Sequence, residues 1–334
     1  MLDLWRKLYS VADRLYALAP WSWLENDRPF GVQDPVTGEI GFIHVTGQEG
    51  QHLGISRYPE AEGLRVLMSL YDDTLDPVSG SEILLNSAQM QVSWENREEL
   101  NPRDKKQIKE LGLKYRGTQA WPQFRSYEPS LYPWFLTQEQ ASTLLTALEQ
   151  SFPVFELLQK DPALFDDLDQ DQYLVRIFSD GEWRDEIREV LPATEKFAVV
   201  SQIPSLPQLK ALAGRKACVE LDMIRMPPVG GDGPEGRPYF PHLPLLVDAN
   251  SGVILSAIEI LPPFPSLEAM YGKVAEKVCV SLLTAQIVPM EIRVRRQVLT
   301  GILAPLTEEL GLRVTFQKHL PKLEEAVQAL AGFL

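Results

Sequence analysis

The sequence predicts an α+β fold for residues 1–214 and an α/β fold with a mixed five-stranded sheet for residues 215–334. Three observations support this division. Apolar residues alternate with a period of two in three consecutive segments between residues 217 and 260, which is typical of strands. After residue 265, helical spacings alternate with short strand-like runs up to the C-terminus. Before residue 214, strand patterns come mainly in hairpins. We expect three parts: a small α+β domain (1–72), a middle α+β region (73–214) and the α/β domain (215–334).

The first part begins with a helix over residues 2–19, whose apolar residues recur at spacings of three and four until Pro20 ends it. Three strands with turn residues between them follow, at 30–34, 39–46 and 52–58. A helix over 60–71 is expected to pack back on this sheet.

The middle region opens with a strand at 89–94 and a helix that Asn101 caps, Pro102 begins and Gly112 ends. Residues 120–136 combine aromatic residues with three prolines. We expect them to pack in an extended form without regular structure, and the alternative is a recognition surface. The remaining elements are helices and strands at 137–150, 154–159, 173–178, 183–190, 196–201 and 205–213.

The C-terminal part has the predicted order β-β-β-α-β-α-β-α. Its strands are expected at 217–225, 239–248, 253–260, 291–295 and 313–317, and its helices at 266–286, 298–310 and 321–334. The first three strands form an antiparallel meander, and the last two return through helices and run parallel to their neighbours. In the first strand, Cys218, Glu220 and Asp222 share one face, and the apolar residues between them share the other.

Two segments of this part carry a family resemblance. The sequence ELDMI at 220–224 places an acid in the first strand, and LLVDANSGVIL at 245–255 reads as a hairpin. With the order of elements, these segments resemble the ribonuclease H and retroviral integrase superfamily. The whole chain also resembles uncharacterised bacterial proteins with an N-terminal domain and a second domain of this type, a resemblance that implies no activity.

The superfamily resemblance implies two metal ions held by carboxylates on the first strand, at the end of the fourth strand and on a later helix. Such ions need several anionic oxygen ligands to act on phosphate groups. Asp222 matches the first position. The fourth strand reads EIRVRRQVL, so Arg295, Arg296 and Gln297 stand where the second carboxylate belongs. Glu324 or Glu325 could supply the helical acid, and the expected site is therefore degenerate.

The same residues suggest a structural role. Arg293 and Arg295 share a face of their strand, as Glu220 and Asp222 do, so the two strands can form cross-strand ion pairs. We hypothesise that Arg295 takes the charge-balancing place of the metal. Thr315 and Gln317 extend this polar stripe, which either lines a cleft or is covered by the N-terminal region.

Composition and charge limit the other classes of function. The net charge is −14, of which residues 1–215 carry −12 (21 Lys/Arg against 33 Asp/Glu), and this disfavours nucleic-acid binding. The four histidines are scattered, and Cys218 and Cys279 lie in apolar surroundings unlike those of reactive thiols. Neither a signal peptide nor a membrane-spanning apolar run is evident. We therefore expect an acidic cytoplasmic protein.

Together these features predict a non-enzymatic binding or scaffolding protein, with no catalytic, cofactor or metal residues and with a protein partner at residues 120–135 or at the polar face. The first alternative is a metal-dependent nuclease or phosphodiesterase that uses Mg²⁺ or Mn²⁺ with Glu220, Asp222, and Glu324 or Glu325. The second is a non-catalytic nucleic-acid-binding module, for which the sequence offers the basic residues Arg293, Arg295, Arg296 and Arg313.

Overall fold

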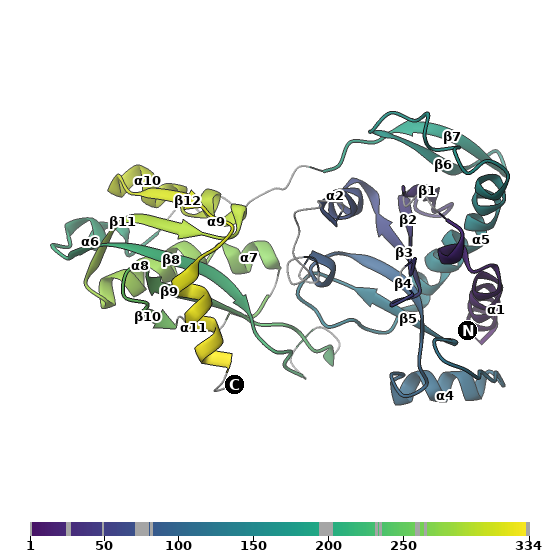
Figure 1. Ribbon diagram of the computed structural model, residues 1–334, viewed down its shortest axis with the longest axis horizontal. Helices are drawn as coiled ribbons and strands as arrows, with labels where there is room; N and C mark the ends of the chain where they lie inside the picture. Colours follow the sequence, from purple (N-terminus) through teal and green to yellow (C-terminus); the bar gives the residue numbers. More distant parts are fainter. Residues whose placement is uncertain are drawn as a thin grey trace. The chain divides into compact units, whose positions relative to one another are not determined.

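The computed structural model describes residues 2–331, except 25–27, 49, 71–79, 81–82, 194–202, 231–232, 234–235, 258–260 and 264–265 (Figure 1). The chain forms two compact units, Met1–Thr194 and Glu195–Leu334. Each is a mixed α/β structure with its own sheet and cores. The expected strand at 196–201 lies outside the described residues.

The N-terminal unit contains a seven-stranded sheet in the order β5-β4-β3-β2-β1-β6-β7. Its strands are β1 (Phe30–Gln33), β2 (Ile40–Thr46), β3 (Gly54–Pro59), β4 (Gln89–Glu95), β5 (Trp121–Tyr127), β6 (Gln172–Ser179) and β7 (Glu182–Glu189). All neighbouring strands are antiparallel except β1 and β6, which run parallel. The expected separate domain of residues 1–72 therefore shares one sheet with the expected middle region. Two strand pairs join them, the antiparallel pair of β3 with β4 and the parallel pair of β1 with β6.

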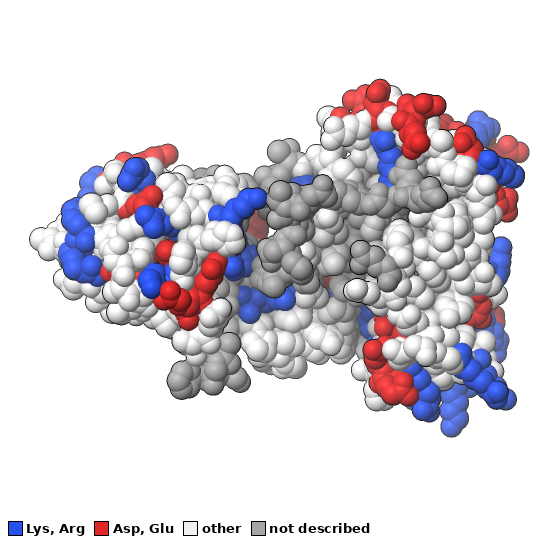
Figure 2. Space-filling model, viewed as in Figure 1, with Lys and Arg blue, Asp and Glu red and all other residues white. Residues whose placement is uncertain are grey.

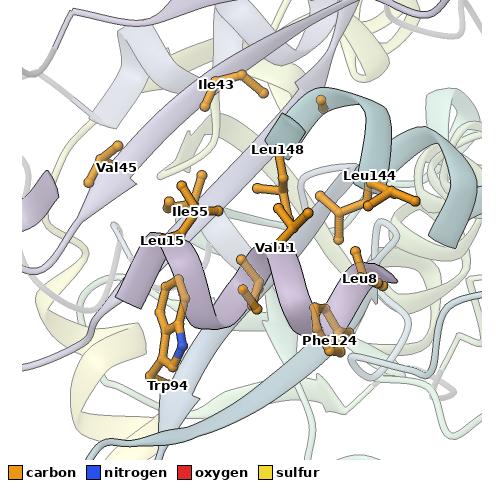
Figure 3. Packing of buried hydrophobic residues seen from close by; sticks show 14 of the residues in the cluster. Leu8, Val11, Leu15, Ile43, Val45, Ile55, Trp94, Phe124, Leu144 and Leu148 are labelled. Carbon is orange, nitrogen blue, oxygen red and sulfur yellow. The ribbon is translucent and has the colours of Figure 1, made fainter. Parts of the chain in front are cut away.

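One face of this sheet is covered by α1 (Leu2–Leu18) and α5 (Gln138–Lys160). Figure 3 shows how Leu8, Val11 and Leu15 of α1 meet Leu144 and Leu148 of α5 above residues of β2 to β5. Helix α1 ends at Leu18, close to the end expected at Pro20, and a short 3-10 helix, η1 (Pro20–Ser22), follows it. The opposite face packs on α2 (Glu60–Leu70), where Leu64 and Leu67 contact a second cluster with Phe42 and Tyr58.

Two predictions for the middle region are wrong. Residues 121–127 of the aromatic segment form a regular strand, β5, whose register with β4 runs from Glu95↔Trp121 to Gln89↔Tyr127. An edge strand tolerates Pro122 because one side of its backbone has no strand partner. The helix expected to stop at residue 150 continues as α5 to Lys160 with Pro153 inside it. Both halves of α5 bury residues in the same core, which compensates for the hydrogen bond that proline removes.

The predicted Asn101 cap is confirmed at α4 (Pro102–Glu110), where the Asn101 side chain accepts from the Arg103 N–H at 2.9 Å. Asp104 completes the capping box by accepting from the Asn101 N–H at 3.1 Å.

The C-terminal unit contains a five-stranded sheet in the order β10-β9-β8-β11-β12. Its strands are β8 (Arg215–Arg225), β9 (His242–Asp248), β10 (Ile254–Ala257), β11 (Ile287–Val294) and β12 (Arg313–Phe316). The predicted antiparallel meander of the first three strands and the parallel pairing of the last two are confirmed. The central strand of the sheet is therefore β8, which carries the acids discussed above.

Helices cover both faces of this sheet. One face packs against α6 (Leu206–Ala211), α8 (Val274–Thr284), α9 (Gln297–Ile302) and α10 (Ala304–Leu310). The other is crossed over β8 and β9 by α11 (Pro321–Ala331), as Figure 1 shows. The long helix expected at 266–286 is interrupted at Gly272 and Lys273, which separate α7 (Leu267–Tyr271) from α8. Among the described residues, no helix combines the length and the apolar character needed to cross a membrane.

Candidate functional site

The candidate site lies on the face of β8 that carries its acids. As predicted, Ala217, Val219, Leu221 and Met223 belong to the apolar core. Glu220 and Asp222 face the other side, and both are buried, with exposed fractions of 1% and 0%. A buried carboxylate needs hydrogen-bond donors or a cation to offset its lost hydration. The partners of these two acids therefore determine what the site can do.

Asp222 binds two arginines. The Arg295 Nε donates to Oδ2 at 2.9 Å, and the Arg296 Nε donates to Oδ1 at 2.8 Å. Oδ1 also accepts from the backbone N–H of Met223 at 2.8 Å. Arg296 in addition donates from Nη2 to the Met223 carbonyl at 2.9 Å. Both carboxylate oxygens are thus occupied by charge-assisted hydrogen bonds, and we name Asp222, Arg295 and Arg296 the Asp222 cluster.

The sequence predicted Arg295 as a partner of Asp222 but assigned no such role to Arg296. Strand alternation places neighbouring residues on opposite faces, so only one of the pair was expected at Asp222. However, β11 ends at Val294 and α9 begins at Gln297, which leaves both arginines in the bend between them. There the alternation no longer applies, and the two guanidinium groups turn to the same carboxylate.

Arg293 does not pair with Glu220 or Asp222, contrary to the expected cross-strand ion pair. It stands opposite Glu220 in the register, but its Nε donates to Glu291 at 3.1 Å. Glu220 instead accepts from the backbone N–H of Leu323 at 2.7 Å. Its carboxylate therefore lies at the first turn of α11, where the helix dipole favours negative charge.

Glu291 accepts hydrogen bonds from three side chains of the polar stripe. It accepts from Thr315 Oγ1 at 3.1 Å and from Cys218 Sγ at 3.3 Å, in addition to Arg293. Burial alone would raise the pKa of Glu291, but these hydrogen bonds hold it below its usual range. Burial and the hydrogen bond to Glu291 raise the pKa of Cys218 to about 11. The thiol is therefore protonated at neutral pH and is a poor nucleophile.

The helical acids of the alternative metal site bind other partners. Glu324 accepts from the Leu320 N–H at 3.2 Å and lies 3.6 Å from His319 Nδ1. Glu325 pairs with Lys322 at 2.8 Å. Within the described part of the chain, no three His, Cys, Asp or Glu side chains gather in a way that could hold a metal ion. The residues present at Asp222 do not suit a cation, because two guanidinium groups would repel it.

A histidine that the sequence did not single out also borders the cluster. His242 begins β9 opposite Arg225, and it is 3% exposed. Burial lowers the pKa of His242 to about 4, and the positive charges of Arg296 and Arg225 act in the same direction. The sequence feature that could have identified His242 is its position at the start of a mostly apolar strand, where it pairs with Arg225 at the end of β8.

This pKa predicts a dependence of stability on pH. Below the usual histidine pKa the unfolded chain binds a proton that the folded chain does not, so stability falls as the pH drops from about 6.5 towards 4. At pH 4 the free energy of unfolding is lower by about 3 kcal/mol because of His242. Urea denaturation of wild type and His242→Gln across this range measures it. The difference between the two proteins should shrink with acidity, and a constant difference would contradict the shifted pKa.

The aromatic segment at 120–136 was the other candidate surface. Its rings mostly serve the fold: Phe124 is buried in the core, and Trp121 packs against it. Phe135 lies under the guanidinium groups of Arg103 and Arg125, at 4.1 and 4.6 Å from the ring centroid. Only Tyr132 of this segment is among the exposed large hydrophobic residues, at 44%. This arrangement favours packing over recognition.

Comparison with known families gives two matches. A family model described as a domain of unknown function, DUF7309, matches residues 5–176. A second domain of unknown function, DUF6930, matches residues 205–331. These spans fall within the N-terminal and C-terminal units, respectively. No curated protein and no solved structure gives a match.

Proposed function

The chain belongs to the DUF7309 family, whose description assigns no activity, and we propose from the Asp222 cluster that it is a non-catalytic binding or scaffolding protein. In this proposal the C-terminal unit is a ribonuclease-H-like domain whose metal site has been replaced by arginines. The partner is a protein, and the cytoplasm is the proposed setting, where the free cysteines Cys218 and Cys279 would stay reduced.

The order of the C-terminal sheet supports the ribonuclease-H-like part of the proposal. A central first strand has an antiparallel meander on one side and two parallel strands on the other. The acid of the first strand, Asp222, lies beside the end of the fourth strand, β11. This is where the resemblance implies that two carboxylates share metal ions.

The main support for a loss of catalysis is that arginines already bind both carboxylate oxygens of Asp222. Both oxygens accept from guanidinium Nε atoms within 2.9 Å. A divalent cation would have to displace two positively charged donors from a fully buried carboxylate, at a large cost in uncompensated charge. The alternative of a nuclease that uses Glu220, Asp222 and a helical acid is correspondingly disfavoured.

A thermal-shift titration with Mg²⁺ and Mn²⁺ tests this proposal. A cation held only by the folded state would add about 2.7 kcal/mol at a hundredfold excess over its Kd. We expect that adding millimolar metal leaves the melting temperature of wild type unchanged, and likewise that of Asp222→Asn. If metal stabilises wild type and leaves Asp222→Asn unchanged, Asp222 is a metal ligand and the proposal is wrong.

A further inference from the structure

The outer edge of β12 differs from that of β7, an edge strand of the N-terminal sheet. Strand β12 (Arg313–Phe316) is the last strand of its sheet, and among the described strands it pairs only with β11. The N–H of Gln317 bonds to the carbonyl of Val294 at 2.9 Å. Because backbone groups alternate in direction along a strand, those of Thr315 also face β11, and those of Val314 and Phe316 face outward. The outer edge therefore presents backbone donors and acceptors.

One face beside this edge is cationic. Arg313 is exposed and stands next to Glu291 in the register, and Arg293 stands next to Thr315. The Arg293 side chain is 34% exposed and binds Glu291 through its Nε. Within the described residues, the structure records no further partner for Arg293 and none for Arg313. Glu291, the acid between them, already accepts from three side chains.

The other face beside the edge is apolar. Phe316 stands opposite Val294, which belongs to the main core of the unit, and it is 45% exposed. Val314 packs partly against the same core. The edge thus combines outward backbone groups, an exposed aromatic ring on one face and arginines on the other. Figure 2 shows basic side chains in blue and acidic ones in red, interspersed on the face of this unit that carries α11.

Edge strands normally carry features that prevent further pairing. The outer strand β7 has them, because its sequence, EWRDEIRE, consists of acids and arginines except for Trp183 and Ile187. Ion pairs tie several of these charges down, such as Arg188 with Glu186 at 3.0 Å. Strand β12 contains no acid and one basic residue, Arg313. At four residues it is short, which limits how long an added strand can be. Its outward backbone groups and Arg313 leave it open to a short added strand that carries negative charge.

We propose that the β12 edge binds an extended segment of a protein partner as an added strand, in which acidic residues alternate with apolar ones. The acidic side chains would face Arg313 and Arg293, and the apolar ones would cover Phe316. This inference rests on the proposed binding function and names its partner chemistry. A short acidic segment fits better than a nucleic acid, because the backbone edge suits a peptide and the net charge of −14 repels a long polyanion.

The test uses the full chain and a fluorescent octapeptide of alternating Glu and Val, followed by anisotropy. We expect saturable binding that weakens with salt. Arg313→Glu should weaken it at least about tenfold, because the exposed charge is reversed without loss of a contact in the fold. The control is Arg184→Glu on the edge strand β7, where the side chain is 54% exposed, and it should bind like wild type.

A backbone variant separates strand addition from simple charge attraction. In Val314→Pro the missing N–H is one that faces outward, so the pairing with β11 persists and the melting temperature should stay close to that of wild type. Peptide binding should nevertheless be lost. Unchanged binding to a folded Val314→Pro protein would overturn the proposal, because it would show that charge alone attracts the peptide.

Three further outcomes would also overturn it: no binding of the Glu/Val peptide, equal binding of a Lys/Val peptide, or preferential binding of a single-stranded oligothymidylate. The last would favour nucleic acid as the partner. The metal titration is independent of these measurements. If the titration shows a metal site while the peptide still binds at β12, the proposal of lost catalysis is wrong and the proposal of a peptide-binding edge is supported.

Discussion

Asp222→Asn is expected to lower the free energy of unfolding of the C-terminal unit by about 2–3 kcal/mol, less than a fully buried ion pair would lose, because the side chains of Arg295 and Arg296 are 36% and 20% exposed. Asparagine keeps the size of the side chain but not its charge. The guanidinium groups of Arg295 and Arg296 would then lose the anion that both contact within 2.9 Å. Substitutions of exposed polar residues usually change the free energy of unfolding by less than about 0.5 kcal/mol, so a loss of this size would indicate a buried partner.

The measurement can be assigned to one unit, because all seven tryptophans lie at positions 5 to 183 in the N-terminal unit. Asp222→Asn should shift the urea transition seen by far-ultraviolet circular dichroism and leave the transition seen by tryptophan fluorescence in place. The control Glu309→Gln removes an exposed ion pair with Lys210 in the same unit and should cost less than about 1 kcal/mol. A loss at Asp222 as small as at Glu309 would contradict a structural role for the cluster.

Arg125→Met is expected to destabilise the N-terminal unit by about 3 kcal/mol. Arg125 donates to both oxygens of Asp104, with Nη1 at 3.0 Å and Nη2 at 2.5 Å, and both side chains are at most 10% exposed. Methionine keeps most of the aliphatic volume against Phe135 but leaves the Asp104 carboxylate buried without its cation. Tryptophan fluorescence reports the loss directly.

Arg103→Met is the matched control for this change. Arg103 stacks on the same ring of Phe135, at 4.1 Å, but it is exposed and makes no recorded ion pair with Asp104. Its replacement should therefore cost less than about 1 kcal/mol. Equal losses for the two variants would show that stacking on Phe135, and not the ion pair, stabilises this region.

The C-terminal unit could be predicted closely because local patterns determine it. Period-two alternation separated the face of Asp222 from the face of Val219, and helical crossovers required the parallel pairing of β11 and β12. The pairing of Arg295 with Asp222 followed from the same logic. That of Arg296 did not, because the alternation ends where β11 ends. Arg293 binds Glu291 instead, which lies two residues away on the same strand.

The N-terminal unit was harder to predict because its sheet depends on contacts between distant segments. The pairing of β1 with β6 joins Gly31 to Val175, and no local pattern specifies it. Pro153 suggested a helix end, but burial on both sides of it outweighs the lost hydrogen bond. The Asn101 cap was predictable because capping depends on adjacent residues alone.

A double-mutant cycle between Asp222 and Arg295 tests most directly whether arginine stabilises the buried acid. Urea denaturation would compare wild type, Asp222→Asn, Arg295→Met and the double variant, and the cycle isolates the interaction energy of the pair. We predict a coupling of about 1.5–3 kcal/mol, as for charge-assisted hydrogen bonds, with the double variant less destabilised than the two single losses together imply. Additive losses would mean that Arg295 does not balance the charge of Asp222, and the account of a metal site replaced by arginines would fail.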